Sequence, residues 1–228
     1  MDNLILRAKN LHKEFIKEKD RISVVKGVNL DIHQGDCLAI MGASGAGKST
    51  LLHMLGTLDR PTQGELYYGT KATNVWRLSD QDLSDFRNRN LGFVFQFHYL
   101  LPEFTALENV MMPALISGMS QGDAAKEAES LLEFIGIKHR MNHRPGELSG
   151  GEQQRVAIAR SVILKPKLLL GDEMTGNLDS ENSRRVIDLL LDLNDEFGIA
   201  ILIVTHDNSV ASRMKRVLTM RDGKIVSS

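Results

Sequence analysis

Cysteine is almost missing from this sequence of 228 residues, and several other absences also narrow its function. The single Cys37 excludes an internal disulfide and fits a reducing cytosol. No apolar run approaches the roughly 18–20 residues that cross a bilayer, so we expect no membrane span. Residues 1–11 mix charged and apolar side chains, and we therefore expect no signal peptide. A net charge of −1 without a basic stripe argues against a nucleic-acid partner.

The clearest motif that is present is a glycine-rich loop. It matches the pattern G-x-x-x-x-G-K-[ST] at Gly42, Ala43, Ser44, Gly45, Ala46, Gly47, Lys48 and Ser49, and Thr50 follows as a further residue expected at the nucleotide. Apolar residues 38–41 predict a buried strand before the loop, and residues 51–55 predict a helix after it. Backbone N–H groups in such a loop bind phosphate. We expect Lys48 to reach the β- and γ-phosphates and Ser49 to ligate Mg²⁺; the alternative is a glycine-rich turn with a solvated lysine.

An acidic pair follows a second predicted strand. Residues 167–171 read as a strand buried on both faces, and Asp172 and Glu173 stand at its carboxyl end, where open α/β sheets bind ligands. Neighbouring strand residues point to opposite sides, so the two carboxylates can have different roles. Asp172 suits Mg²⁺, and Glu173 suits a general base that polarises the attacking water. The alternative is a solvated acidic turn.

A third motif is Ser149-Gly150-Gly151-Glu152, in which serine and glutamate have capping-box spacing at a helix start. The two glycines would leave bare N–H groups suited to phosphate, although a capped helix without a ligand has the same pattern. With these three motifs in this order, the chain resembles the ATP-binding subunits of the ABC ATPase family over essentially its whole length.

The resemblance implies a fold and a domain organisation. The fold class would be α/β, a P-loop NTPase with a RecA-like, mostly parallel core sheet, an antiparallel β subdomain and an inserted α-helical subdomain. The whole chain, 1–228, would form one nucleotide-binding domain, with the helical subdomain at about 97–160.

Further site residues follow from the same resemblance. Phe15 matches the aromatic residue that stacks on adenine, and Gln96 matches the Q-loop glutamine near Mg²⁺ and the reaction centre. Residues 177–179 match the D-loop, ending at Asp179, and His206 matches the switch histidine at the γ-phosphate. Each has an alternative: a core aromatic for Phe15, a loop amide for Gln96, a helix cap for Asp179 and a satisfied strand-end histidine for His206.

The family pattern also implies partners and a reaction. Two copies of the chain would pair head to tail, with ATP and Mg²⁺ between the phosphate loop of one and Ser149-Gly150-Gly151 of the other. One position departs from the pattern: Met174 follows Glu173 where relatives usually have proline. Methionine lifts the restriction that proline places on the preceding residue, and we expect hydrolysis to depend little on this exchange.

The segment after Gln96 indicates the membrane partner. In ABC transporters this region, here 97–110, faces the membrane subunit, and with residues 142–147 it resembles the lipoprotein-releasing ATPases. That resemblance implies a peripheral protein on the cytoplasmic face of the inner membrane. It would dock on integral membrane permease subunits (LolC/LolE-like) and drive lipoprotein release toward the outer membrane. The ATPases of MacB-type macrolide or peptide exporters and of FtsE-type cell-division complexes share the core motifs and stay open as alternatives.

Local patterns predict the remaining elements. We expect strands at 4–9, 24–32 and 64–68, helices at 79–90, 105–116, 120–136 and 179–197, and a terminal hairpin at 217–226.

Overall fold

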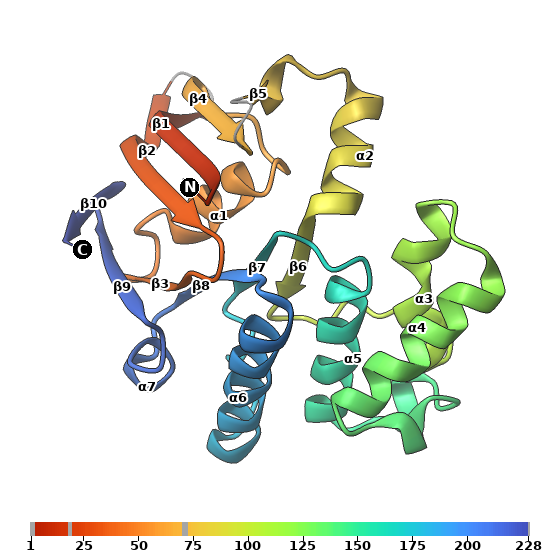
Figure 1. Ribbon diagram of the computed structural model, residues 1–228. Coiled ribbons are helices and arrows are strands. Elements are labelled where there is room, and N and C mark those ends of the chain that lie inside the picture. The colour runs from red at the N-terminus through yellow and green to blue at the C-terminus, as the bar shows by residue number, and fades with distance from the viewer. Residues whose placement is uncertain (1–2, 18–19, 70–72, 228) are drawn as a thin grey trace.

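The computed structural model describes residues 3–17, 20–69 and 73–227. Its central sheet has the strand order β10-β9-β3-β8-β7-β6 (Figure 1). The strands are β3 (Cys37–Met41), β6 (Leu91–Phe95), β7 (Leu168–Asp172), β8 (Ala200–Thr205), β9 (Arg216–Arg221) and β10 (Lys224–Ser227). All neighbours pair in parallel except β9 and β10, which form the expected hairpin at the edge. The predicted mostly parallel core sheet is confirmed.

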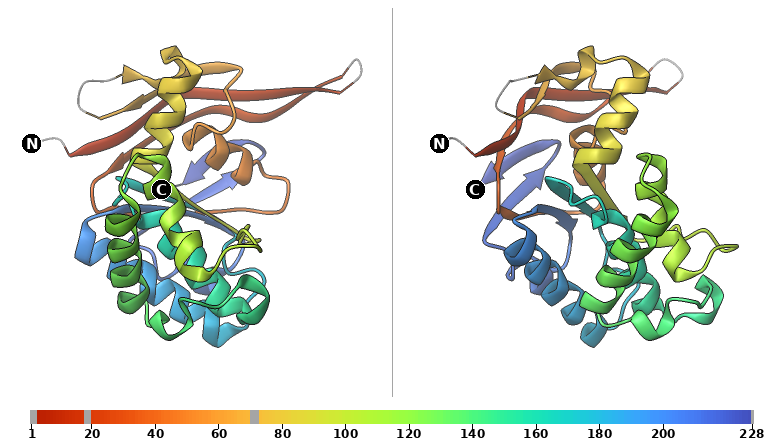
Figure 2. Two further views of the ribbon diagram at one scale, coloured as in Figure 1. Left: turned by 90° about the vertical axis from the view of Figure 1, so that its right-hand side faces the viewer. Right: turned by 45° about the vertical axis from the view of Figure 1, so that its right-hand side comes forward.

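An antiparallel sheet lies above the central one, with the order β2-β1-β4-β5. Its strands are β1 (Leu4–Lys17), β2 (Asp20–His33), β4 (Gln63–Tyr68) and β5 (Thr73–Asn74). β1 and β2 are longer than the expected 4–9 and 24–32, and their ends form a projecting arm (Figure 2). The register shifts several times along this pair, and each bulge breaks the alternation that marks a strand in the sequence. We call described residues 12–17 and 20–25 the arm.

Side-chain caps fix where most helices begin. Ser79, Thr105, Ser120, Ser149 and Asp179 each accept a backbone N–H at an N-cap position. The α-helices are α1 (Lys48–Leu55), α2 (Asp80–Asn90), α3 (Ala106–Ile116), α4 (Gln121–Phe134), α5 (Gly150–Val162), α6 (Ser180–Phe197) and α7 (Asn208–Ala211). Short 3₁₀ turns are η1 (Val75–Arg77), η2 (Lys138–Arg140) and η3 (Pro145–Glu147). The expected helices are confirmed to within about two residues at each end.

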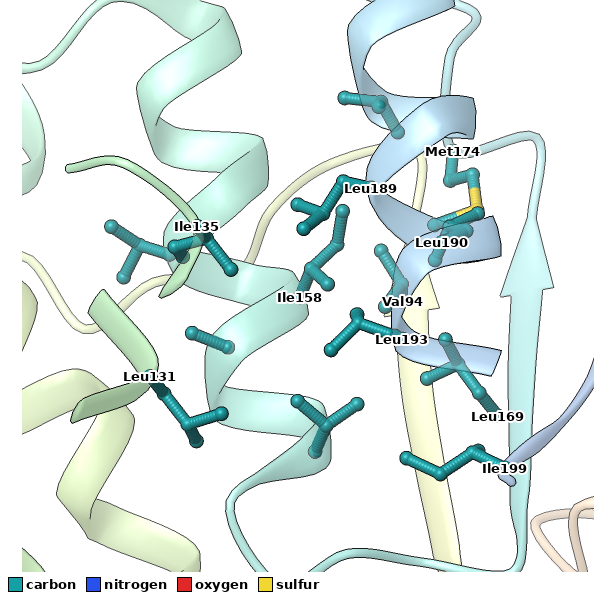
Figure 3. Packing of buried hydrophobic residues seen from close by; sticks show 14 of the residues in the cluster. Val94, Leu131, Ile135, Ile158, Leu169, Met174, Leu189, Leu190, Leu193 and Ile199 are labelled. Carbon is teal, nitrogen blue, oxygen red and sulfur yellow. The ribbon is translucent and has the colours of Figure 1, made fainter. Parts of the chain in front are cut away.

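The central sheet separates two apolar cores, because successive strand residues face opposite sides. Leu168 and Leu170 of β7 pack with α1 and the antiparallel sheet, whereas Leu169 packs with the helices on the other side. Figure 3 shows Leu169 beside α6, whose Leu193 belongs to the same buried cluster. Each such leucine stabilises the fold by about 1.5–3 kcal/mol, so the sheet is held rigidly between its layers.

Helices α3, α4 and α5 stand together beside α6, at one side of the molecule (Figure 1). They lie between β6 and β7 in the sequence. Across residues 3–17, 20–69 and 73–227, none of the helices combines the length and the apolar character that a bilayer crossing requires.

Candidate active site

Three strands of the central sheet end side by side at one edge. Met41 of β3 is in register with Thr205 of β8, and Asp172 of β7 is in register with Val204 of β8. The loops after these strands therefore meet. They carry the glycine-rich loop, Glu173 and His206, and in the sequence the loop lies more than a hundred residues before the other two.

The glycine-rich loop, residues 42–49, is closely wrapped. A Cβ atom on Gly42 would lie 2.3 Å from the carbonyl oxygen of Met220, and one on Gly47 would lie 2.7 Å from that of Val24. Gly47 also has φ of 98°, a conformation that side chains disfavour. Both glycines are therefore required by close backbone contacts.

Lys48 begins α1 and is buried, with 5% of its surface exposed. Its Nζ donates hydrogen bonds to the carbonyl oxygens of Gly42 at 2.8 Å and Ala43 at 3.1 Å. The ammonium group thus lies across the curled loop, next to the positive end of the α1 dipole, and this combination attracts a polyphosphate.

Ser49 and Asp172 are brought together from opposite halves of the chain. Ser49 Oγ donates a hydrogen bond of 2.8 Å to Asp172 Oδ1, and His53 Nε2 lies 3.6 Å from Asp172 Oδ2. A hydroxyl and a carboxylate are hard oxygen ligands of the kind that Mg²⁺ takes beside substrate phosphates. These residues fit the predicted magnesium site.

Glu173 adopts an unusual backbone conformation, with φ of 43°. Its N–H donates to the Val204 carbonyl at 3.0 Å, and its carboxylate Oε1 lies 3.2 Å from His206 Nδ1. Strained non-glycine residues cost of order 1–3 kcal/mol and concentrate at functional sites. In this conformation the Glu173 carboxylate lies beside His206, so the two predicted reaction residues are adjacent.

Met174 has a role that the sequence did not indicate. Its side chain is buried, and its Sδ lies 2.7 Å from where a Cβ on Gly171 would stand. Figure 3 shows it beside Leu190 of α6. Methionine therefore packs the loop of Glu173 into the core, using space that a glycine in β7 leaves free.

Gln96 follows β6 and contacts the loop after Glu173. Its Nε2 donates to Asn177 Oδ1 at 3.2 Å, and Asn177 Nδ2 donates to the Gln96 carbonyl at 3.2 Å. This reciprocal amide pair joins the Q-loop to the D-loop. Asp179, at the end of the D-loop, caps α6 by accepting from the Asn182 N–H at 2.8 Å. This bond is the main cause of the lowered pKa of Asp179.

Ser149, Gly150 and Gly151, which we call the signature segment, open α5. Ser149 N–H donates to Glu152 Oε2 at 2.8 Å, which completes the expected capping box. That bond, with help from the nearby Arg140, lowers the pKa of Glu152. A Cβ on Gly151 would lie 2.9 Å from Asn182 Oδ1, so this glycine lets α5 approach α6. Among the described residues, no hydrogen bond links the signature segment to the glycine-rich loop.

Phe15 lies on the arm with 43% of its surface exposed, rather than in a core. The base of the arm reaches the glycine-rich loop, since Val24 of β2 approaches Gly47. An open pocket of about 560 Å³ borders Glu173 and His206 and continues along α6 to Arg184. Phe15 and the Glu173–His206 pair are therefore both accessible to solvent.

The sequence missed two residues next to the site. His53 contacts Asp172 and lies four positions after Ser49, on the same helix face, so its spacing was a usable signal. Lys13 lies over the Phe15 ring and is two residues before it, on the same strand face. Its other contacts come from a loop about 46 residues away, which no local pattern indicates.

The same edge of a mostly parallel sheet carries a glycine-rich phosphate-binding loop, a hydroxyl and a carboxylate suited to Mg²⁺, and a glutamate–histidine pair. This combination defines a P-loop nucleoside triphosphatase. Comparison with known proteins narrows this class. The ABC transporter family pattern matches residues 25–176.

Two curated relatives are similar over nearly their full lengths. The lipoprotein-releasing system ATP-binding protein LolD of Syntrophus aciditrophicus is 53% identical over 98% of this chain and 99% of its own. The LolD protein of Geobacter metallireducens is 52% identical over 98% of each. Among solved structures, the dimeric ATP-binding cassette MJ0796 bound to ADP and Pi has a TM-score of 0.88 and 39% identity, covering 97% of this chain and 96% of its own. This chain belongs to the ABC transporter family, and it is an ATPase.

Proposed function

We propose that this chain supplies the ATP-driven step that releases lipoproteins from the inner membrane toward the outer membrane. The observation that carries the proposal is the match, at about half identity over nearly whole chains, to relatives named as ATP-binding proteins of lipoprotein-releasing systems. The chain also carries a phosphate-binding loop, a hydroxyl–carboxylate pair suited to Mg²⁺ and a candidate general base, which are the groups that ATP hydrolysis requires.

In this proposal the glycine-rich loop and Lys48 hold the β- and γ-phosphates of ATP. Ser49 and Asp172 hold Mg²⁺, with Gln96 contributing once it turns from Asn177. The ion would neutralise charge on the phosphate oxygens when bound. Glu173 accepts a proton from the attacking water, and His206 orients the Glu173 carboxylate and contacts the γ-phosphate.

A second copy of the chain would complete the site. The signature segment presents its helix N-terminus on α5, apart from the glycine-rich loop of the same chain, so the γ-phosphate would meet this positive end only across a dimer. Two solved relatives are described as dimeric. Asp179 and its loop would lie at the contact between the two copies.

The membrane partner would bind the segment after Gln96. Phe97 and Tyr99 expose 62% and 65% of their surfaces, yet the backbone at residues 98–99 is held by hydrogen bonds. Arg160 of α5 donates to the carbonyl oxygens of Tyr99 at 2.7 Å and His98 at 2.8 Å. Exposed apolar side chains on a fixed backbone suit docking to a permease of the LolC/LolE type, which would place this chain at the cytoplasmic face of the inner membrane.

The test is to purify a tagged Glu173→Gln variant from native membranes with MgATP and identify the bound proteins by mass spectrometry. The Lys48→Ala variant, handled identically, is the matched control and should capture far less. We expect a lipoprotein-release permease, with lipoprotein attached. A macrolide-exporter or cell-division permease would overturn the proposed cargo, and the absence of any permease would overturn the transport role.

A further inference from the structure

The side chain of Lys13 occupies one side of the exposed Phe15 ring. Its Nζ lies 5.0 Å from the ring centroid, a distance typical of a cation–π contact. The two residues are i and i+2 on β1, so they share one face of the strand. A flat base stacking on Phe15 is then left with the opposite side of the ring.

The Lys13 ammonium group is also held by hydrogen bonds to the loop that follows α1. Its Nζ donates to the Asp59 carboxylate and, at 2.8 Å, to the Arg60 carbonyl. The Lys13 side chain is only 13% exposed, so solvent and salt screen this pair less than an ordinary surface ion pair.

The same loop holds the neighbouring strand backbone. Thr62 N–H donates to the His12 carbonyl at 2.8 Å, and Glu14 N–H donates to Thr62 Oγ1 at 3.0 Å. Asp59 N–H in turn contacts the carbonyl of His53, in the last turn of α1, at 3.3 Å. Contacts thus run from the end of α1 to the aromatic ring.

Helix α1 therefore links the two ends of a nucleotide site. Its first turn carries Lys48 and Ser49, and its last turn is tied through Asp59 to Lys13. We propose that Lys13 is a positioning residue for the base: it closes one side of Phe15 and sets the ring at a fixed distance from the phosphate loop. This inference rests on the proposed function and on the prediction from the sequence that Phe15 stacks on the adenine of ATP.

The experiment compares binding of ATP and of inorganic tripolyphosphate, a probe that has no base. Lys13→Met keeps most of the apolar stem and removes the charge and the donors. We expect it to weaken ATP binding about five-fold while tripolyphosphate binding changes less than about two-fold, measured by calorimetric titration. Lys9→Met is the matched control, because Lys9 lies 5.2 Å from the Tyr67 ring centroid on the same strand, and it should change neither ligand.

A double variant shows whether Lys13 acts through the ring. Lys13→Met combined with Phe15→Ala should bind ATP no more weakly than Phe15→Ala alone. Additive losses, or an equal loss for both probes in Lys13→Met, would overturn the positioning role. If Phe15→Ala itself leaves the preference for ATP over tripolyphosphate unchanged, the predicted stacking of Phe15 on adenine is wrong, whereas the proposed role in lipoprotein release is untouched. Thermal unfolding of each variant checks that the fold persists.

Discussion

Two regions of the proposed site differ in how completely a single chain forms them. One is the edge of the central sheet that carries the glycine-rich loop, Asp172, Glu173 and His206, which we call the phosphate edge; the other is the signature segment. At the phosphate edge, Ser49 contacts Asp172 and Glu173 contacts His206, so side chains from distant motifs complete each other. The signature segment instead makes its hydrogen bonds within its own capping box. A single chain thus forms the contacts of the phosphate edge by itself, whereas its signature segment would complete the site of a second copy. Changes at the first region should act within one chain, and changes at the second should act between chains.

Removing the base should have the largest effect. Glu173→Gln keeps the size of the side chain and loses its ability to take a proton. We expect hydrolysis to fall by roughly 10²–10⁴ with ATP binding retained, since this is the range of general-base catalysis. Phosphate release and nucleotide titration on the same preparation measure the two effects separately.

The control for that variant is Lys48→Ala, which removes the buried ammonium group from the phosphate loop. It should lose ATP binding itself, and hydrolysis with it. Turnover of Glu173→Gln within a few-fold of the original protein would remove Glu173 as the base.

Two glycines of the same loop give a matched pair. An alanine at Gly47 would bring its Cβ 2.7 Å from the Val24 carbonyl at φ of 98°, whereas an alanine at Gly45, with φ of 79°, would have nothing within 4 Å. We expect Gly47→Ala to lower the free energy of unfolding by about 2–3 kcal/mol and Gly45→Ala by about 1 kcal/mol. Urea denaturation compares them. Equal losses would mean that backbone strain alone, and not the approach of β2, restricts the loop.

The two regions also differ in what the sequence could predict. The glycine-rich loop, the acidic pair and the capping boxes are local patterns, and the structure places them on the expected strands and helices. The contact of Ser49 with Asp172 joins residues 123 apart, and only the order of parallel strands brings it about. Pairings such as Lys13 with Asp59 leave no local signal, because they depend on how loops pack. The length of the arm was underestimated because its bulges disrupt the period of two.

Substitutions of Met174 test whether the conformation of the Glu173 loop depends on the packing of the buried side chain or on restriction of the backbone. Met174→Leu conserves apolar volume and should cost less than about 1.5 kcal/mol. Met174→Pro removes buried atoms beside Gly171 and should lower the free energy of unfolding by about 2 kcal/mol, because a cavity remains. Below the unfolding temperature, hydrolysis by the proline variant should stay within several-fold. A loss above about ten-fold in a folded variant would show that position 174 controls the orientation of the base.

A change in the signature segment should have one of the smallest effects on stability. Ser149→Ala removes the cap of α5 and should cost about 1 kcal/mol at neutral pH. The pKa of Glu152 is lowered in the folded chain, chiefly by the Ser149 N–H and to a lesser degree by the Ser149 hydroxyl, so this carboxylate stabilises the fold above the ordinary glutamate pKa and loses that effect as the pH falls through its lower folded value. Alanine keeps the N–H bond and removes the hydroxyl, which donates to Glu152 Oε2 at 2.8 Å, so the variant loses only the hydroxyl's share of this effect.

Urea denaturation of the original protein and of Ser149→Ala from pH 7 to about pH 3 should therefore show a gap in the free energy of unfolding that narrows slightly below about pH 4.3. Because the segment would act only across the dimer, ATP binding by single chains should be unchanged, while ATP-dependent dimerisation of a Glu173→Gln background should weaken. If Ser149→Ala weakened ATP binding by the monomer, the signature segment would contribute to the site of its own chain, and the proposal that it acts only on the second copy would be wrong.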